Sequence, residues 1–148
     1  MRKLVSVFAV ISVLVSGAVY AKNLSVDMDF KKADVAAKEA EADEWLKKGN
    51  TAYQAKDYDE AIKCYKKATE LDPVFASAFY NLGIIYAEKK LPDESIAAYK
   101  KVLTIKPDYH AARNNLASVY IQKGMIDEAI AELEKALAGD TDLPHAHF

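Results

Sequence analysis

The amino-acid sequence predicts an all-α protein built from three stacked helical hairpins. Its 148 residues are 51% hydrophobic and 28% charged, with only 5 Gly and 4 Pro, which is typical of an ordered helical protein. Residues 42–143 can also be written as three rows of 34 residues without a gap, over 42–75, 76–109 and 110–143. A period of this length is typical of stacked supersecondary units, each of which buries its apolar face against the next.

Small side chains recur in two columns of these rows. The columns are Gly49, Gly83 and Ala117, and Ala61, Ser95 and Ala129. We expect the two helices of each hairpin to approach closely at these columns, with bulky neighbours such as Tyr65 filling the space beside them. In the first row we expect one helix over 42–55, a turn at 56–58, and a second helix capped by Asp59 and ended by Asp72 and Pro73.

The period, the small columns and the prolines that end the first two rows resemble the tetratricopeptide repeat. Trp45 and Phe79 share an aromatic column, from which Arg113 in the third row departs. The resemblance implies a right-handed α-solenoid. It also implies a non-catalytic interaction module, an adaptor or scaffold that binds a peptide segment of a partner in a concave groove.

In this family the groove is lined by the first helix of each hairpin. We do not expect the hairpin core to need the residues that this resemblance places in the groove. They are Leu46, Lys47, Asn50, Tyr53, Gln54, Tyr80, Asn81, Ile84, Ala87, Glu88, Asn114, Asn115, Ser118, Ile121 and Gln122. Side-chain amides can donate to and accept from the main chain of an extended peptide. The alternative is a solvated amide face without a ligand.

Some members of the family clamp the terminal carboxylate of a chaperone tail with a Lys/Asn/Asn/Lys/Arg set. Asn50 and Asn81 match the two asparagines of that set. Leu46, Ala111 and Asn115 stand where its three cations would be. A carboxylate would have no compensating charge there, so we do not expect this specificity.

Residues 1–21 have the layout of a secretory signal peptide. Arg2 and Lys3 precede an apolar run over 4–15, and small residues lead up to Ala21, after which cleavage is expected. The protein is then expected in the bacterial periplasm or outside the cell, with no membrane insertion after cleavage. The alternative is an uncleaved inner-membrane anchor, because residues 4–20 reach the short limit for a membrane span.

Residues 22–41 connect this segment to the first hairpin. We expect a flexible tether at 22–29 and one continuous helix over 30–55, where Ala, Lys, Glu and Asp dominate. At the other end, residues 144–148 are expected to form a tail. Ile130 and Leu137 point toward the place of a further repeat. This exposed end suggests homodimerisation, and an alternative function as an oligomerising subunit of an envelope or secretion assembly.

Several classes of function find no support in the sequence. The net charge is −2 and no Lys/Arg-rich run stands out, so nucleic-acid binding is not expected. No arrangement of nucleophile and base and no phosphate-binding loop indicates an enzyme, and no cofactor is expected. Asp142, His145 and His147 lie in a short tail and are not expected to bind metal. Cys64 is the only cysteine, so no internal disulfide can form, and we expect a half-buried side chain that fills space on a helix. The alternative is an intermolecular disulfide or a reactive thiol.

Overall fold

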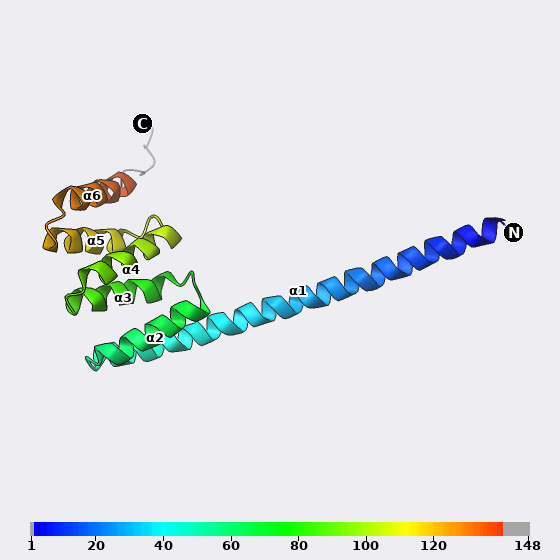
Figure 1. The fold of residues 1–148 in the computed structure, drawn as a ribbon, viewed down its shortest axis with the longest axis horizontal. Helices are drawn as coiled ribbons and strands as arrows, with labels where there is room; N and C mark the ends of the chain where they lie inside the picture. Colours follow the sequence, from blue (N-terminus) through cyan, green and yellow to red (C-terminus); the bar gives the residue numbers. More distant parts are fainter. Residues whose placement is uncertain (1, 141–148) are drawn as a thin grey trace, which may run out of the picture. The chain divides into compact units, whose positions relative to one another are not determined.

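The computed structural model describes the backbone of residues 2–140 and the side chains of residues 27–137, and this part is helical without a strand (Figure 1). The helices are α1 (Arg2–Gln54), α2 (Tyr58–Leu71), α3 (Ala76–Glu88), α4 (Pro92–Ile105), α5 (His110–Gln122) and α6 (Ile126–Asp140). The chain divides into two compact units, Met1–Ala40 and Glu41–Phe148. In the second unit each helix packs on the next in chain order, so the predicted all-α stack of three hairpins is confirmed.

The first unit is helical from Arg2 onward. The prediction of a flexible tether at residues 22–29 was therefore wrong. No Gly or Pro lies between Gly17 and Gly49, so nothing in the sequence interrupts a helix there. The continuous helix expected over 30–55 is present as far as Gln54. No helix in the part whose side chains are described is long and apolar enough to cross a membrane, and the apolar segment 4–20 lies outside that part.

All three hairpins turn in the same way. The second residue after each first helix takes a left-handed conformation, with φ of 62° at Lys56, 58° at Lys90 and 76° at Gly124. The next amide donates back across the end of the helix, from Asp57 to Ala52 O, Leu91 to Tyr86 O and Met125 to Tyr120 O, at 2.8–2.9 Å. This 6→1 bond is the mark of a Schellman motif, which satisfies carbonyls at a helix end. The turn position therefore recurs every 34 residues, and only the third repeat fills it with glycine.

Replacing Lys90 with glycine should stabilise the protein. A left-handed conformation costs a non-glycine residue about 1–2 kcal/mol, and glycine loses part of that gain to its greater freedom when unfolded. We expect the free energy of unfolding to rise by about 0.5–1 kcal/mol in urea titrations. As a control, Lys100→Gly in the interior of α4 should lower it by about 1 kcal/mol. A loss of stability in Lys90→Gly would contradict this account of the turn.

The caps of the second helices differ from the prediction. The N-cap of α2 is Asp57, whose carboxylate accepts from the amide of Glu60 at 3.1 Å. Asp59, the predicted cap, lies in the first turn of α2 and pairs with Lys89 at 2.5 Å. Asp93 pairs in the same way with Lys123, 34 residues along. The first-turn aspartates therefore link each of these hairpins to the next, rather than closing their own helix.

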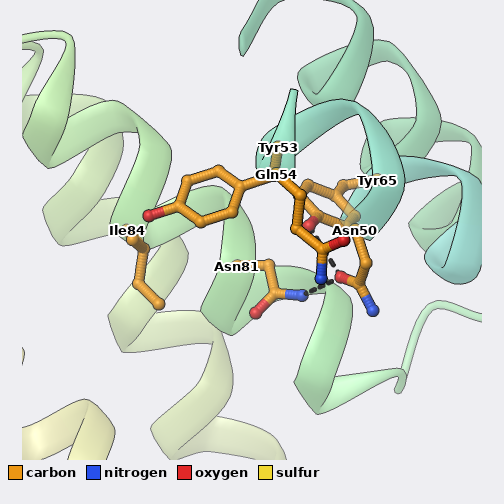
Figure 2. A pocket seen from close by; sticks show the side chains of 6 residues that line it. All are labelled: Asn50, Tyr53, Gln54, Tyr65, Asn81 and Ile84. Carbon is orange, nitrogen blue, oxygen red and sulfur yellow. Dashed lines mark hydrogen bonds between the residues drawn. The ribbon is translucent and has the colours of Figure 1, made fainter. Parts of the chain in front are cut away.

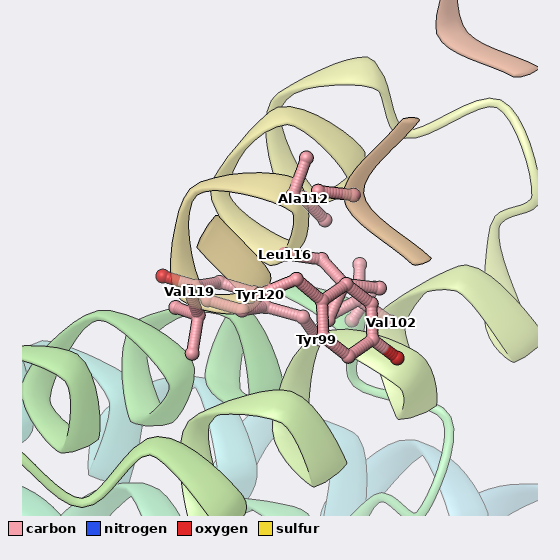
Figure 3. Packing of buried hydrophobic residues seen from close by; sticks show 9 residues of the cluster. Tyr99, Val102, Ala112, Leu116, Val119 and Tyr120 are labelled. Atoms are coloured by element: carbon pink, nitrogen blue, oxygen red, sulfur yellow. The ribbon is translucent and has the colours of Figure 1, made fainter. Parts of the chain in front are cut away.

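The small columns lie where the helices of a hairpin meet, as predicted. A methyl group added to Gly49 would lie 2.5 Å from Cε1 of Tyr65, and one added to Gly83 would lie 2.5 Å from Cε1 of Tyr99. Both tyrosines are buried. The hydroxyl of Ser95 is also buried and donates to the carbonyl of Gly83 at 2.7 Å. Figure 3 shows Tyr99 beside residues of α4 and α5 in an apolar cluster that also includes Ala76 of α3 and Ala129 of α6.

Arg113 replaces an aromatic residue by pairing with the last helix. Its guanidinium donates to Glu132 of α6 at 2.8 Å and to the carbonyl of Pro107, with both charged side chains mostly buried. Burial raises the pKa of Glu132, but Lys135 and Arg113 outweigh it and hold the pKa below its usual value. The third hairpin therefore has an ion pair between its two helices at the position where the first two have the aromatic rings of Trp45 and Phe79.

Candidate functional site

A cavity of about 270 Å³ opens on the face of α1 and α3 that the sequence predicts as the groove (Figure 2). The side chains that line it come from α1, α2 and α3. They are Asn50, Tyr53, Gln54, Tyr65, Asn81 and Ile84. The cavity therefore lies between the first and second hairpins. Its lining combines amide and phenol groups with the aliphatic side chain of Ile84.

Asn50 organises the polar side of this first cavity. Its Oδ1 accepts from the hydroxyl of Tyr65 at 2.7 Å and from Nδ2 of Asn81 at 3.0 Å (Figure 2). A buried tyrosine needs such a partner for its hydroxyl. No described residue bonds the Nδ2 of Asn50 or the Oδ1 of Asn81. One donor group and one acceptor thus stay free for a ligand, and Asn50 also supports the fold.

A second cavity of about 220 Å³ repeats the first one along the solenoid. Its lining residues are Ile84, Ala87, Glu88, Tyr99, Asn115, Ser118, Val119 and Gln122. Tyr99 and Asn115 stand 34 residues after Tyr65 and Asn81. Nδ2 of Asn115 donates to the hydroxyls of Tyr80 at 3.1 Å and Tyr99 at 3.4 Å. Ile84 takes the place of Asn50, so this second cavity is the more apolar of the two.

Tyr53 and Glu88 tie the two hairpins together at the edge of the groove. The hydroxyl of Tyr53 donates to Oε1 of Glu88 at 2.6 Å. This bond, with a smaller contribution from burial, raises the pKa of Tyr53 to about 12. The phenol therefore stays neutral at physiological pH and keeps one oxygen of the Glu88 carboxylate occupied.

The predicted groove residues divide into two groups. Those exposed to solvent are Lys47, Gln54, Glu88, Asn114, Ser118, Ile121 and Gln122. Others pack partly into the core, and for these the expectation that the hairpins do not need them was wrong. Leu46 packs beside Ala42 and Ala68, while Tyr80, Ile84 and Ala87 pack against the cluster around Leu116. The reason is that neighbouring first helices touch, so one face of the groove is also the seam between repeats.

Tyr65 and Tyr99 belong to the site, although the sequence predicted for Tyr65 only a role in packing beside the small columns and did not single out Tyr99. Their rings are buried, but each forms part of a cavity floor. The sequence holds a signal for this arrangement. In both cases an asparagine follows the tyrosine by 16 residues, which places an amide of the next hairpin beside the phenol.

Two further predictions concern metal ligands and the cysteine. Within the described residues no cluster of three or more His, Cys, Asp or Glu side chains could hold a metal ion, and Asp142, His145 and His147 lie outside them. Cys64 is more buried than expected, with 3% of its surface exposed. Burial raises the pKa of its thiol, which disfavours the reactive thiolate.

Comparisons with known proteins agree with this architecture. Family models described as TPR repeat and tetratricopeptide repeat match residues 49–90 and 87–147. The crystal structure of MamA is 31% identical over 67% of this chain and 58% of its own, with a TM-score of 0.66. The second TPR of Spaghetti (RPAP3), bound to the HSP90 peptide SRMEEVD, is 20% identical over 70% of this chain and 95% of its own, with a TM-score of 0.66.

A curated relative matches a shorter stretch. Protein bimA of Emericella nidulans is 45% identical over 42 residues, which are 28% of this chain and 5% of bimA. The chain thus spans little more than half of MamA and a small part of bimA. The two family models together cover residues 49–147, which include most of the first hairpin and both later ones, and the solved structures share their stacking. The chain belongs to the tetratricopeptide repeat family.

Proposed function

We propose that this protein is a non-catalytic interaction module that binds an extended, uncharged segment of a partner protein along α1, α3 and α5. The observation that supports the proposal is the pair of cavities spaced one repeat apart. Each combines a buried tyrosine, an asparagine with a free acceptor, and an aliphatic wall. Amide groups can pair with the main chain of a peptide, and the apolar walls can take its side chains.

The charges of the groove argue against an acidic tail as the ligand. RPAP3 has been solved with the peptide SRMEEVD, but at 20% identity the likeness extends to the fold alone. Here Leu46 is half-buried, Ala111 carries no charge, and Asn115 bonds two tyrosines. These three positions offer no cation for a terminal carboxylate, whose burial without a partner would be costly.

Filling the second cavity should weaken partner binding. Ser118 is exposed on α5 and lines that cavity, so Ser118→Trp should block it without disturbing the core. We expect a pull-down from native extract, read by mass spectrometry, to lose the specific partner at least tenfold, a change of about 1.4 kcal/mol. Asn50→Ala would be a poorer choice, because it also removes the hydrogen-bond acceptor of the Tyr65 hydroxyl.

Thr104→Trp is the matched control, since Thr104 is exposed on α4 away from both cavities. It should retain the partner. The peptide SRMEEVD serves as a second control and should show no saturable binding to the wild-type chain. Equal recovery of the partner by Ser118→Trp and the wild type would rule out the groove as the binding site.

Export of the protein is a separate part of the proposal. It is supported by the basic start, the apolar run and the small residues before Ala21. N-terminal sequencing of the protein recovered from its host should give a chain that begins at Lys22. A chain that begins at Met1 in the membrane fraction would instead indicate the anchored form.

A second candidate function is an oligomerising subunit that associates through α6. It is favoured by the exposure of Ile130 and Leu137. Light scattering over a concentration series distinguishes this candidate, since it requires a dimer or larger species. The charges on α6 favour a different occupant of that face.

A further inference from the structure

Helix α6 carries an apolar stripe that no described part of the chain covers. Ile126, Ile130, Leu133 and Leu137 follow one another at intervals of three or four residues, which places them on one face of the helix. Their exposed fractions run from 39% at Leu133 to 67% at Leu137. An adjacent side of α6 packs on α5 through buried Ala129 and the ion pair of Glu132. The stripe is therefore a second face of α6.

The earlier hairpins show what covers the equivalent positions. Ile96 and Leu103 of α4 correspond to Ile130 and Leu137, and both pack against the cluster that contains Leu116 and Val119 of α5. Ile62 of α2 packs in the same way against the cluster that contains residues of α3. In each case the occupant is the amphipathic first helix of the following hairpin.

An acidic edge runs along the same stripe. Asp59 pairs with Lys89 and Asp93 with Lys123, across each junction between hairpins. Asp127 is the third member of this series and has no ion pair among the described residues. Glu134, one heptad later, lies on the same edge. A helix that covers the stripe therefore meets two carboxylates. In the two earlier hairpins, the aspartate equivalent to Asp127 forms an ion pair with a lysine of the covering helix.

A second copy of the chain fits this face poorly. In a head-to-tail stack, α1 would have to play the part of α3, but Glu44, Lys48 and Thr51 stand where α3 has Ala78, Leu82 and Ile85. Ala55 stands in the column of Lys89, so Asp127 would gain no cation. In an antiparallel pair of α6 helices, Asp127 would face Glu134 of the other copy, and like charges in contact are unfavourable.

We infer that α6 is a docking site for an amphipathic helix of a different protein. This helix carries large apolar side chains along one stripe and a lysine or arginine at its C-terminal end, where it meets Asp127. The apolar stripe supplies the affinity, and the acidic edge sets the register and the direction of the helix. The inference does not depend on the groove, because α6 lines neither groove cavity.

The chain supplies a probe for this site in its own α3. A fluorescent peptide with the sequence of residues 76–90 carries Phe79, Leu82, Ile85 and Lys89, the side that covers α2. A side-chain staple between positions 84 and 88, which line the groove, keeps so short a peptide helical. Fluorescence anisotropy with the full-length chain should show saturable binding with one peptide per chain.

Substitutions on α6 decide whether the probe binds there. Ile130→Ser/Leu137→Ser should weaken binding at least tenfold, while Glu128→Ser, exposed on α6 away from the stripe, should leave it unchanged. Asp127→Lys should weaken binding about threefold to tenfold. A probe with Lys89→Glu should recover that loss with the Asp127→Lys chain and lose affinity for the wild type.

Four results would overturn the inference. They are the absence of saturable binding, equal binding by the double serine variant, failure of the reversed charge pair to restore affinity, and a wild-type dimer that Ile130→Ser/Leu137→Ser dissociates. The last result would show that a second copy occupies the stripe. Circular dichroism of each variant checks that its helicity equals that of the wild type.

Discussion

Replacement of Tyr99 by alanine should lower the free energy of unfolding by about 3–5 kcal/mol, the range for truncating a large buried ring. The side chain is 2% exposed and packs with Val102, Leu116 and Val119 in the cluster that holds the second hairpin to the third. A solenoid is stabilised largely by such contacts between neighbouring repeats, so their loss weakens both hairpins. Urea titration followed by circular dichroism measures the change.

Tyr99→Phe is the matched control because it keeps the ring and removes the hydroxyl. Burial raises the pKa of Tyr99 to about 12, so the group removed is a neutral phenol whose bond from Asn115 is long, at 3.4 Å. We expect a loss of about 1 kcal/mol or less. A Tyr99→Ala variant no less stable than Tyr99→Phe would show that the ring does not hold the hairpins together.

The second large effect concerns the glycine that faces this ring. Alanine at position 83 would gain about 1 kcal/mol in helix propensity. Its methyl group would also lie 2.5 Å from Cε1 and 2.8 Å from Cζ of Tyr99, and overpacking of this kind costs about 1–3 kcal/mol. Because the ring is buried and has little room to move, we expect a net loss of about 1–2 kcal/mol in Gly83→Ala.

A double-mutant cycle identifies the cause of that loss. In a Tyr99→Ala background the methyl group meets open space, so Gly83→Ala should become neutral or stabilising by up to about 1 kcal/mol. If the loss is the same in both backgrounds, steric conflict with Tyr99 is not its source. Thermal unfolding of the four proteins in one buffer provides the comparison.

The sequence predicted the hairpins because their signals are local and repeated. Gly49 and Gly83 indicated close helix contacts because they have no side-chain volume. Asp72 and Pro73 indicated a helix end through their effect on the local backbone. The cap of α2 was harder to predict, because two aspartates lie two residues apart at the turn. Asp59 instead pairs with Lys89 of the next hairpin. Capping rules consider only neighbours in the sequence, so they could not predict this contact.

The site was predicted less completely than the fold. A column assignment gave the face on which Asn81 and Asn115 lie, but not that Asn81 bonds Asn50 of the first hairpin or that Asn115 bonds two tyrosine hydroxyls of the second. It also treated Leu46 as a free groove residue, although packing between hairpins half-buries that side chain. Such roles depend on contacts between repeats, and the period of a sequence shows that repeats stack without showing which atoms then meet.

The one-sided packing of α6 has a consequence for local stability. Helices α2 to α5 are each held by neighbours on both sides, whereas α6 rests on α5 and leaves its stripe in water. Its amide hydrogens should therefore exchange with solvent faster than those of α3 and α4, through opening events that leave the remainder of the solenoid folded. A partner helix seated on the stripe would slow this exchange, so deuterium uptake by α6 would report its occupancy without any label on the partner.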